Sequence, residues 1–318
     1  MSITPTTEDR IWAVLSHLSS LAFGMGIVLP IIGWSDQRRK SNYASFQSLQ
    51  ALGYQSLGFT IWVLPYMVII IVASIILLAM LGSRDGSSQN MDADLGPWII
   101  AIFIVLLGLF ALYFILPIVA AIACALGKDF RYPIIGDRLA RYLEYDPTQK
   151  SEGQIWLNED HEFRWTVAMG HFSIIILLWG ILAPLTTLII YRKHSFFLSF
   201  QSIQTLVYQV FTTILYIGAG FLYLFGFFSL IALTGLTGEL NLNSPIAMLG
   251  VIVFGVSLLI VFVIALSVPL MHILGQWAGY RVLKGDNYHY PLVGRLVDKW
   301  ISKNLPSRRD AHENLDRN

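Results

Sequence analysis

Two sets of glutamine and tyrosine residues, 154 positions apart, are the first candidates for chemistry in this sequence. In each set two glutamines and a tyrosine are spaced i, i+3 and i+7 on one helix face, and another glutamine follows. The sets are Gln47, Gln50, Tyr54 and Gln55, and then Gln201, Gln204, Tyr208 and Gln209. Carboxamides donate and accept hydrogen bonds, so these side chains could line a polar vestibule at the end of a membrane span. They could equally bond the backbone of a neighbouring broken helix.

Three histidines, His17, His171 and His272, lie in apolar segments and are candidate titratable groups inside a membrane. His17 and His171 occupy equivalent positions, whereas His272 has no counterpart. A proton relay would need a carboxylate close by, and the apolar segments around these histidines contain none. We therefore expect each histidine to bond a backbone carbonyl.

The sequence carries no motif of a common enzyme class. It lacks a P-loop, a Gly-x-Ser-x-Gly elbow, a His-Glu-x-x-His motif and a dinucleotide fingerprint. Cys124 is the only cysteine, which excludes an intramolecular disulfide and a cysteine-based metal site. The net charge of +1 does not suggest nucleic-acid binding. We expect a protein that is not an enzyme, with no catalytic residues, no cofactor and no metal.

Long apolar stretches must position these side chains. Apolar residues make up 55% of the chain and charged residues 13%, against roughly 25% charged in soluble proteins. Asp, Glu, Lys and Arg are absent from residues 51–81, 97–126, 197–233 and 246–280. Charge-free runs of this length are typical of membrane-spanning helices. The composition predicts an all-α, polytopic helical membrane protein.

The chain also contains an internal repeat. Residues 10–55 align without a gap with residues 164–209, with 16 identities in 46 positions. A second block, Gly127 with Tyr132-Pro133, recurs 158 positions later as Gly285 with Tyr290-Pro291. We therefore predict a first membrane repeat at 8–145, a polar linker at 146–161, a second membrane repeat at 162–303 and a disordered polar tail at 304–318.

Each repeat begins with an apolar segment that glycine and proline interrupt. Gly24, Gly26 and Pro30 lie in the first such segment, and Gly180 and Pro184 lie in the second. Each half would form about 18 Å of helix, too short for a hydrocarbon core of about 30 Å. We expect a re-entrant helical hairpin, followed by two long spans. This arrangement places 20 of the 21 Lys and Arg on one side, with both termini cytoplasmic. Six ordinary spans remain the alternative.

A short amphipathic helix is predicted after each Tyr-Pro step. Residues 135–143 and 293–303 both alternate apolar and basic faces, a pattern typical of helices that lie on a membrane surface. Membrane lipids are therefore expected partners of this chain.

Short motifs in the repeat resemble a known family. They are Arg10-Ile11-Trp12 with His17-Leu18-Ser19, then Phe46 with Gln50-Ala51-Leu52, then Gly127 with Arg131-Tyr132-Pro133. The unit resembles the bacterial Tic-like membrane domain (domain of unknown function 4870), which is related to the twenty-kilodalton import component of the chloroplast inner envelope. The second copy departs from the motifs at Thr205 and His289.

The resemblance implies a multi-pass protein of the bacterial cytoplasmic (inner) membrane that works in a membrane protein complex or as a homo-oligomer. We expect a non-enzymatic scaffold or subunit related to translocation or transport. The alternative is a small-molecule or lipid transporter whose path lies between the two repeats. The resemblance assigns no role to individual residues.

Overall fold

The computed structural model describes residues 4–82, 91–147, 157–191, 195–235 and 244–304, and these residues form helices and no strand. The all-α prediction is confirmed. By length and composition, four helical stretches of the described residues could cross a membrane: Thr7–Gln37, Gly96–Ala125, Phe196–Gly235 and Pro245–Leu283.

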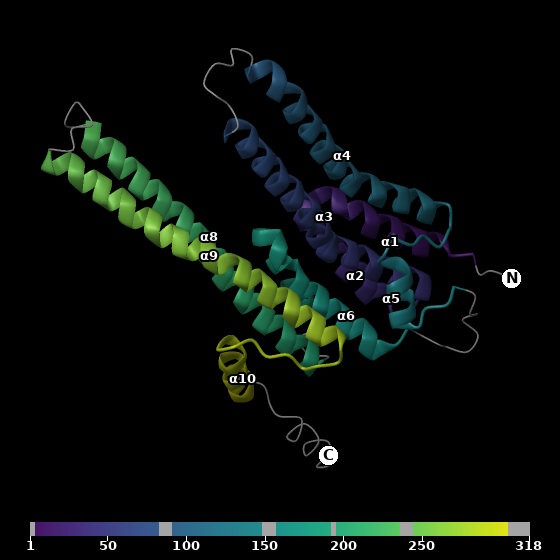
Figure 1. The fold of residues 1–318 in the computed structure, drawn as a ribbon. Coiled ribbons are helices and arrows are strands. Elements are labelled where there is room, and N and C mark those ends of the chain that lie inside the picture. The colour runs from purple at the N-terminus through teal and green to yellow at the C-terminus, as the bar shows by residue number, and fades with distance from the viewer. Residues whose placement is uncertain (1–3, 83–90, 148–156, 192–194, 236–243, 305–318) are drawn as a thin grey trace. The chain divides into compact units, whose positions relative to one another are not determined.

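The chain divides into two compact units, Met1–Ile190 and Tyr191–Asn318 (Figure 1). The first unit contains α1 (Thr7–Leu18), η1 (Ser19–Ile27), α2 (Val28–Gln37), α3 (Asn42–Gly82), α4 (Met91–Ala125), α5 (Gly136–Leu143), α6 (Glu159–Phe172), η3 (Ser173–Ile181) and α7 (Leu182–Tyr191). The second contains α8 (Phe196–Gly235), α9 (Pro245–Leu283) and α10 (Val293–Asn304). The division falls at the end of α7, so the first segment of the second predicted repeat lies in the first unit. The predicted repeat boundaries stay predictions.

The first apolar segment is a broken helical hairpin. Its α-helices α1 and α2 are joined by the 3₁₀ helix η1, in which Phe23 departs from helical geometry with φ 54° and ψ −142°. The two helices then pack side by side, because a Cβ on Gly33 of α2 would lie 3.0 Å from the Ser16 hydroxyl of α1. Pro30 is the third residue of α2, where its missing N–H removes no helical hydrogen bond.

The second hairpin has the same construction. Helices α6 and α7 flank η3, and Pro184 is again the third residue of its helix. The two arms approach each other where a Cβ on Gly170 would lie 3.8 Å from the Pro184 ring. Ser173 donates from its hydroxyl to the Gly180 carbonyl at 2.8 Å and closes the hairpin. A Gly/Pro-broken hairpin in each predicted repeat is confirmed.

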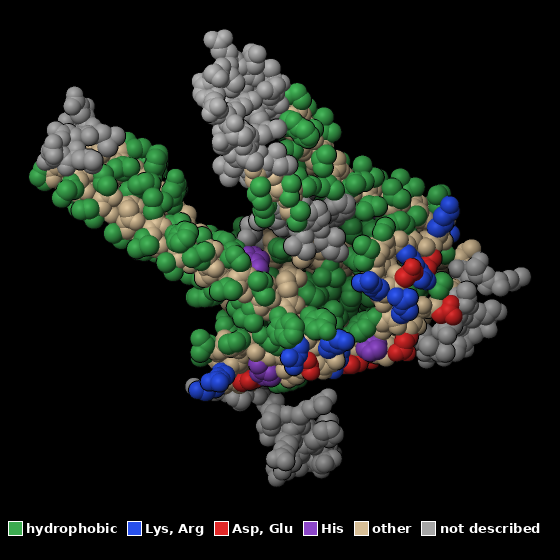
Figure 2. All heavy atoms as spheres, viewed as in Figure 1, with side chains coloured by type: hydrophobic (Ala, Val, Ile, Leu, Met, Phe, Trp, Pro, Cys, Tyr) green, Lys and Arg blue, Asp and Glu red, His purple; other side chains and the backbone are tan. Residues whose placement is uncertain are grey.

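Four helices of 35 to 41 residues, α3, α4, α8 and α9, are the longest elements. At 1.5 Å per residue they are about 50–60 Å long, more than a hydrocarbon core of about 30 Å requires. Hydrophobic side chains coat the outer surfaces of α8 and α9 (Figure 2). The exposed apolar surface matches what lipid, rather than water, would cover.

Two short amphipathic helices follow the Tyr-Pro turns. Helix α5 buries Leu139 and Leu143, and α10 buries Val297 and Ile301 against Phe200 of α8. Four segments lie outside the described residues: 305–318 of the predicted tail at 304–318, the centre of the linker at 148–156, and the connections 83–90 and 236–243.

Candidate functional site: the glutamine clasp

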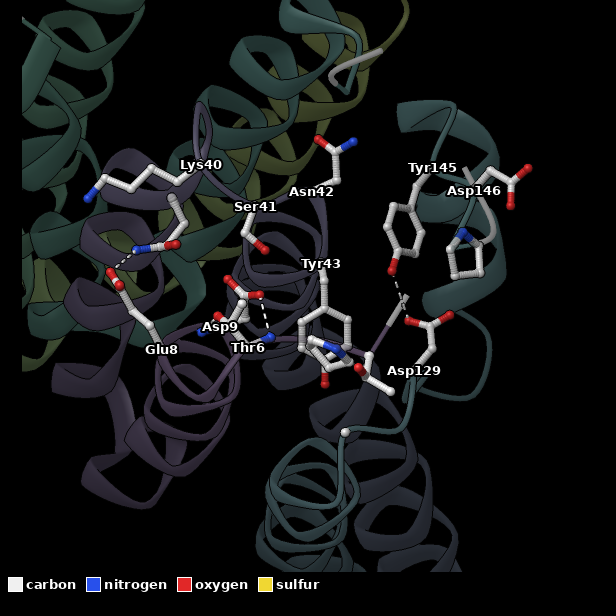
Figure 3. Close-up of a pocket in the computed structure, with 15 residues that line it drawn as sticks. Thr6, Glu8, Asp9, Lys40, Ser41, Asn42, Tyr43, Asp129, Tyr145 and Asp146 are labelled. Carbon is white, nitrogen blue, oxygen red and sulfur yellow. Dashed lines mark hydrogen bonds between the residues drawn. The ribbon is translucent and has the colours of Figure 1, made fainter. Parts of the chain in front are cut away.

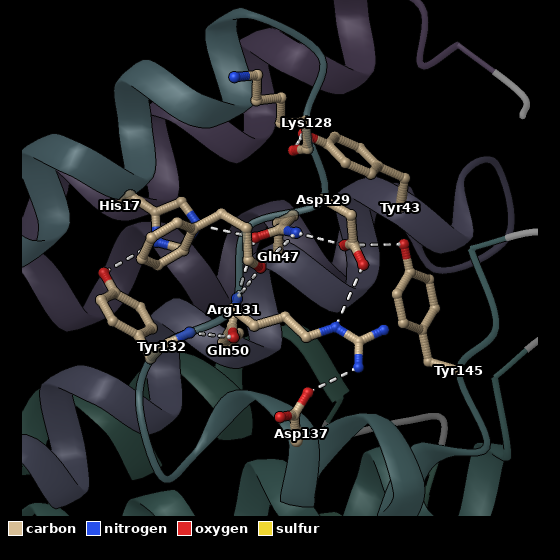
Figure 4. A network of polar contacts seen from close by, with 11 residues as sticks. His17, Tyr43, Gln47, Gln50, Lys128, Asp129, Arg131, Tyr132, Asp137 and Tyr145 are labelled. Carbon is tan, nitrogen blue, oxygen red and sulfur yellow. Dashed lines mark hydrogen bonds and ion pairs between the residues drawn. The ribbon is translucent and has the colours of Figure 1, made fainter.

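Gln47 and Gln50 of α3 hold the extended segment that follows α4 (Figure 4). Their Nε2 atoms donate to the Phe130 carbonyl at 3.1 and 2.9 Å, and Gln50 Oε1 accepts from the backbone N–H of Tyr132 at 2.9 Å. Gln50 Nε2 also donates to Gln47 Oε1 at 3.1 Å. A buried segment outside a helix leaves backbone groups without helical partners, and these carboxamides supply them. We call this arrangement the glutamine clasp.

His17 completes the clasp from α1. Its Nε2 lies 3.0 Å from Gln47 Oε1 and its Nδ1 lies 3.1 Å from the Tyr132 hydroxyl. Gln47 Nε2 already donates to Asp129 and Phe130, which fixes its other terminal atom as the oxygen. An oxygen there requires the proton on His17 Nε2, so Nδ1 accepts from the tyrosine. The histidine is buried and has both ring nitrogens in hydrogen bonds.

Tyr132 stacks on Tyr54 of α3, with ring centroids 4.2 Å apart and an interplanar angle of 11°. The Tyr54 hydroxyl donates to the Tyr113 carbonyl at 2.9 Å. That carbonyl would accept from the N–H of residue 117 in a regular helix, and residue 117 is proline. Tyr54 therefore supplies a donor that Pro117 removes from α4.

The glutamine and tyrosine contacts recur in the second unit. Gln201 and Gln204 donate to the Tyr288 carbonyl at 3.0 and 2.7 Å, and Gln204 Oε1 accepts from the Tyr290 N–H at 3.2 Å. Tyr208 stacks on Tyr290 at 4.1 Å, and its hydroxyl donates to the Met271 carbonyl at 3.1 Å. The clasp is thus built twice, at the positions that the sequence alignment pairs.

Both clasps hold a backbone turn that is unusual for the residues in it. Ile134 has φ 70° and Leu292 has φ 66°, although glycine is the residue that normally occupies this region. Such a conformation persists where surrounding contacts determine it. Here the clasp fixes Tyr132 and Tyr290, two residues upstream of each turn.

The remaining predicted site residues are buried, except His272, which is half-buried. Gln55 and Gln209 are buried, and Gln55 Nε2 donates to the Ser16 carbonyl and the Ser19 hydroxyl of the first hairpin at 3.4 and 2.9 Å. His171 is buried, and His272 Nδ1 lies 2.9 Å from the Val268 carbonyl within α9. These contacts favour the structural interpretation of the glutamines. The vestibule stays a prediction.

A charged rim borders the first clasp on its exposed side. Asp129 accepts from Gln47, from the Tyr145 hydroxyl at 3.3 Å and from Arg131 Nε at 3.3 Å. Burial raises the pKa of the Asp129 carboxyl, and Arg131 opposes that shift. Arg131 also pairs with Asp137 of α5 at 2.8 Å. The rim therefore ties α3, the turn and α5 together.

A pocket of about 470 Å³ lies beside the rim, with Asp129 and Tyr145 on one side and Thr6, Glu8 and Lys40 on the other (Figure 3). The sequence did not indicate this pocket. Its acidic residues do not form a metal centre, since no group of three or more His, Cys, Asp or Glu within the described residues could hold a metal ion.

A second polar cluster, also not anticipated, fastens α6 to α2. Glu162 of α6 accepts from Trp34 Nε1 at 3.0 Å and lies 3.5 Å from Arg38. Arg38 also pairs with Glu159 at 2.8 Å. Burial raises the pKa of the Glu162 carboxyl to about 7, while Arg38 lowers it. The repeat alignment offered one clue to Glu162, because Glu8 and Glu162 are identical residues 154 positions apart.

Comparison with known families identifies one match. The model of the Magnetosome magnetite crystal formation protein family matches residues 8–139, which is less than half of the chain. No curated protein and no solved structure matches this chain.

The resemblance to the Tic-like domain is therefore wrong, because the family whose model matches the first repeat is a different one. The motifs behind that resemblance include His17, Gln50 and Tyr132, which are residues of the clasp. These residues fasten a broken hairpin to a turn. Because that is a packing requirement, it does not specify a family.

Proposed function

We propose that this chain is a non-enzymatic membrane scaffold, or a subunit of a membrane complex, in a compartment where magnetite crystals form. The match of residues 8–139 to the magnetite crystal formation family carries this proposal. The matched range contains the whole first clasp, including His17, Gln47 and Tyr132. Similarity over that range supports a shared architecture at the membrane where the mineral grows.

The burial and hydrogen bonding of the polar residues support a non-enzymatic role. His17 and both clasp glutamines are buried and hydrogen-bonded to one another or to backbone. His272 contacts the Val268 carbonyl and the Tyr216 hydroxyl. A general acid or base must reach a substrate proton. Because these groups are already engaged in hydrogen bonds that hold the fold, they have little access to a substrate.

The membrane itself is the first partner in this proposal. The long apolar helices are suited to lipid. The family match favours the bacterial cytoplasmic membrane or a compartment derived from it, and the distribution of Lys and Arg favours an orientation with both termini cytoplasmic. Other membrane proteins, including further copies of this chain, complete the proposed set of partners.

A transporter is the less favoured function. It would need Gln55, Gln209 or His272 to line a polar path, whereas Gln55 and Gln209 are each only 2% exposed. Gln55 is also held by the hairpin through Ser16 and Ser19.

Fractionation of magnetite-forming bacteria tests the proposal. A tagged chain is expressed in such cells, and crystal-bearing membranes are collected with a magnet. We expect the chain to be enriched there relative to an unrelated inner-membrane protein, and to resist extraction by carbonate. Equal distribution over all membranes, or release by carbonate, would contradict it.

A further inference from the structure

The second clasp fixes α10 at one end of the α8–α9 hairpin (Figure 1). Gln201 and Gln204, near the start of α8, hold the Tyr288 carbonyl of the segment that joins α9 to α10. At this end α8 begins its charge-free run, 197–233, and α9 completes its own, 246–280. Because lipid covers charge-free runs and water covers charged segments, α10 lies at the border between the two.

Helix α10 has two apolar stripes and buries only one of them. Val297 and Ile301 pack on α8. Leu296 and Trp300, which directly precede them, form a second stripe and are 65% and 50% exposed. Leu292, just before the helix, continues this stripe and is 75% exposed. The fold of the second unit therefore uses the first stripe and leaves the second on the surface.

Basic side chains border the exposed stripe. Arg295 and Lys299 are exposed and lie beside it, on the side of α10 that faces away from α8. The acidic residue of α10, Asp298, is two positions after Leu296 and thus lies on the opposite side of the helix. It pairs there with His289 at 3.3 Å. The charge next to the exposed stripe is therefore positive.

The end of α9 carries aromatic and basic side chains of the same kind. Trp277 and Tyr280 are exposed. Arg281 and Lys284 each lie 5.8 Å from the centroid of one of these rings. Tryptophan and tyrosine are enriched where a membrane meets water, and Lys and Arg reach lipid phosphates there. This end of the second unit therefore has the composition of a membrane–water interface.

The equivalent helix of the first unit lacks the exposed stripe. With a shift of 158 positions, Arg138 and Tyr142 of α5 stand where Leu296 and Trp300 stand in α10. Tyr142 stacks on His161 of α6, with ring centroids 4.5 Å apart. A protein contact thus covers this face of α5. The apolar, indole and cationic side chains of α10 instead match the surface of a lipid bilayer.

We propose that the exposed stripe of α10, together with Arg295 and Lys299, docks on the headgroups of anionic phospholipids in the membrane that the chain spans. The apolar side chains enter between the headgroups, and the two cations pair with lipid phosphates. Each cation enriches anionic lipid roughly fivefold. The inference goes beyond the proposed function. It concerns the class of lipid and not the compartment, so its failure would leave the proposed function standing.

Fluorescence quenching in nanodiscs tests this docking. The full chain carries Cys124→Ser and Leu296→Cys, and the new cysteine is labelled with the fluorophore NBD. The nanodiscs contain phosphatidylcholine and a small fraction of a lipid with a doxyl quencher close to its headgroup, which is either phosphatidylglycerol or phosphatidylcholine. Iodide measures exposure to water. The matched control is Arg138→Cys on α5, where the exposed Arg141 keeps a positive charge nearby.

We expect doxyl-phosphatidylglycerol to quench the label at residue 296 at least about fivefold more than doxyl-phosphatidylcholine does. Arg295→Gln with Lys299→Gln should remove this preference, and the label at residue 138 should show a smaller one. Circular dichroism confirms that each variant folds, since the substituted side chains are exposed.

Four results would each overturn the proposal. Equal quenching by the two doxyl lipids at residue 296 would show that α10 does not select anionic lipid. An equal preference at residue 138 would show that anionic lipid gathers around the whole protein. Quenching by iodide alone would show that water covers the stripe, and protection from iodide and both lipids would show that protein covers it.

Discussion

Replacing Gln50 with leucine tests whether the clasp holds the turn after α4. The change removes three hydrogen bonds, but only one group loses every clasp partner. Phe130 still accepts from Gln47, and Gln47 Oε1 still accepts from His17. The Tyr132 N–H, which donates to Gln50 Oε1 in the wild type, stays buried and loses this acceptor.

The magnitude follows from that one orphaned donor. An unsatisfied buried N–H costs about 1–3 kcal/mol, and leucine regains part of the loss through its apolar surface. We expect local opening of the turn to become easier by about 2 kcal/mol, which is roughly a 30-fold increase in the open population.

Cys124 reports this opening directly. It is the only cysteine, it is buried, and the Gly127 N–H donates to its carbonyl at the start of the segment that the clasp holds. The rate of maleimide labelling in lipid nanodiscs should therefore rise about 30-fold in Gln50→Leu, by the same conversion of free energy.

Gln55→Leu is the matched control, because Gln55 is also buried on α3. It bonds Ser16 and Ser19, and the Ser19 hydroxyl already donates to the Ser16 carbonyl. No described group loses its last partner, so the labelling rate should change less than threefold. Equal rates in the two variants would refute the clasp.

Three further variants address other contacts. Glu162→Gln should flatten the pH dependence of the free energy of unfolding. Burial raises the folded-state pKa of the Glu162 carboxyl from 4.5 to about 7, so the wild type loses up to about 3 kcal/mol of stability as pH rises through that window. Thermal melts from pH 4 to 8 measure this, and a wild-type slope in the variant would count against a buried carboxylate. Val297→Asp should release α10 from α8 by burying a charge, so trypsin should cleave at Arg295 faster than in Leu296→Asp, whose side chain is exposed. Gly53→Ala in α3 should lower stability by about 1–3 kcal/mol through the clash with Trp165 of α6. Gly58→Ala should leave stability unchanged, because its Cβ would have ordinary contacts at 3.7 Å. Equal melting temperatures of the two alanine variants would contradict the α3–α6 contact.

The hairpins were predictable because their cause is local. Glycine and proline interrupt each apolar segment, and in each segment a 3₁₀ helix, η1 or η3, joins the two α-helices. The site of the break was not predictable, because Phe23 rather than a glycine has the positive φ. Its neighbour Gly24 lies against Trp179 and Ile176 of the second hairpin, where a Cβ would be 2.4 and 2.6 Å away. Tertiary packing therefore decides which residue departs from helical geometry.

The clasp was predictable only in part. Spacing placed Gln47, Gln50 and Tyr54 on one helix face, but their partners at Phe130 and Tyr132 are about 80 residues away. A single sequence does not show which distant backbone groups need hydrogen-bond partners. The recurrence of Tyr-Pro in both copies was the available clue, and we interpreted it only as the start of an amphipathic helix.

Crystal size in magnetite-forming cells tests the central claim, that buried polar residues support a scaffold rather than a transport path. Cells that lack a member of the matched family receive the wild-type chain, Gln50→Leu, or Gln55→Leu combined with Gln209→Leu, and crystal diameters are measured by electron microscopy. The scaffold proposal predicts that the wild type and the double variant restore the same diameter, while Gln50→Leu restores less. Loss of crystals in a folded, membrane-inserted double variant would contradict it, because a scaffold that still folds and inserts does not need those two side chains.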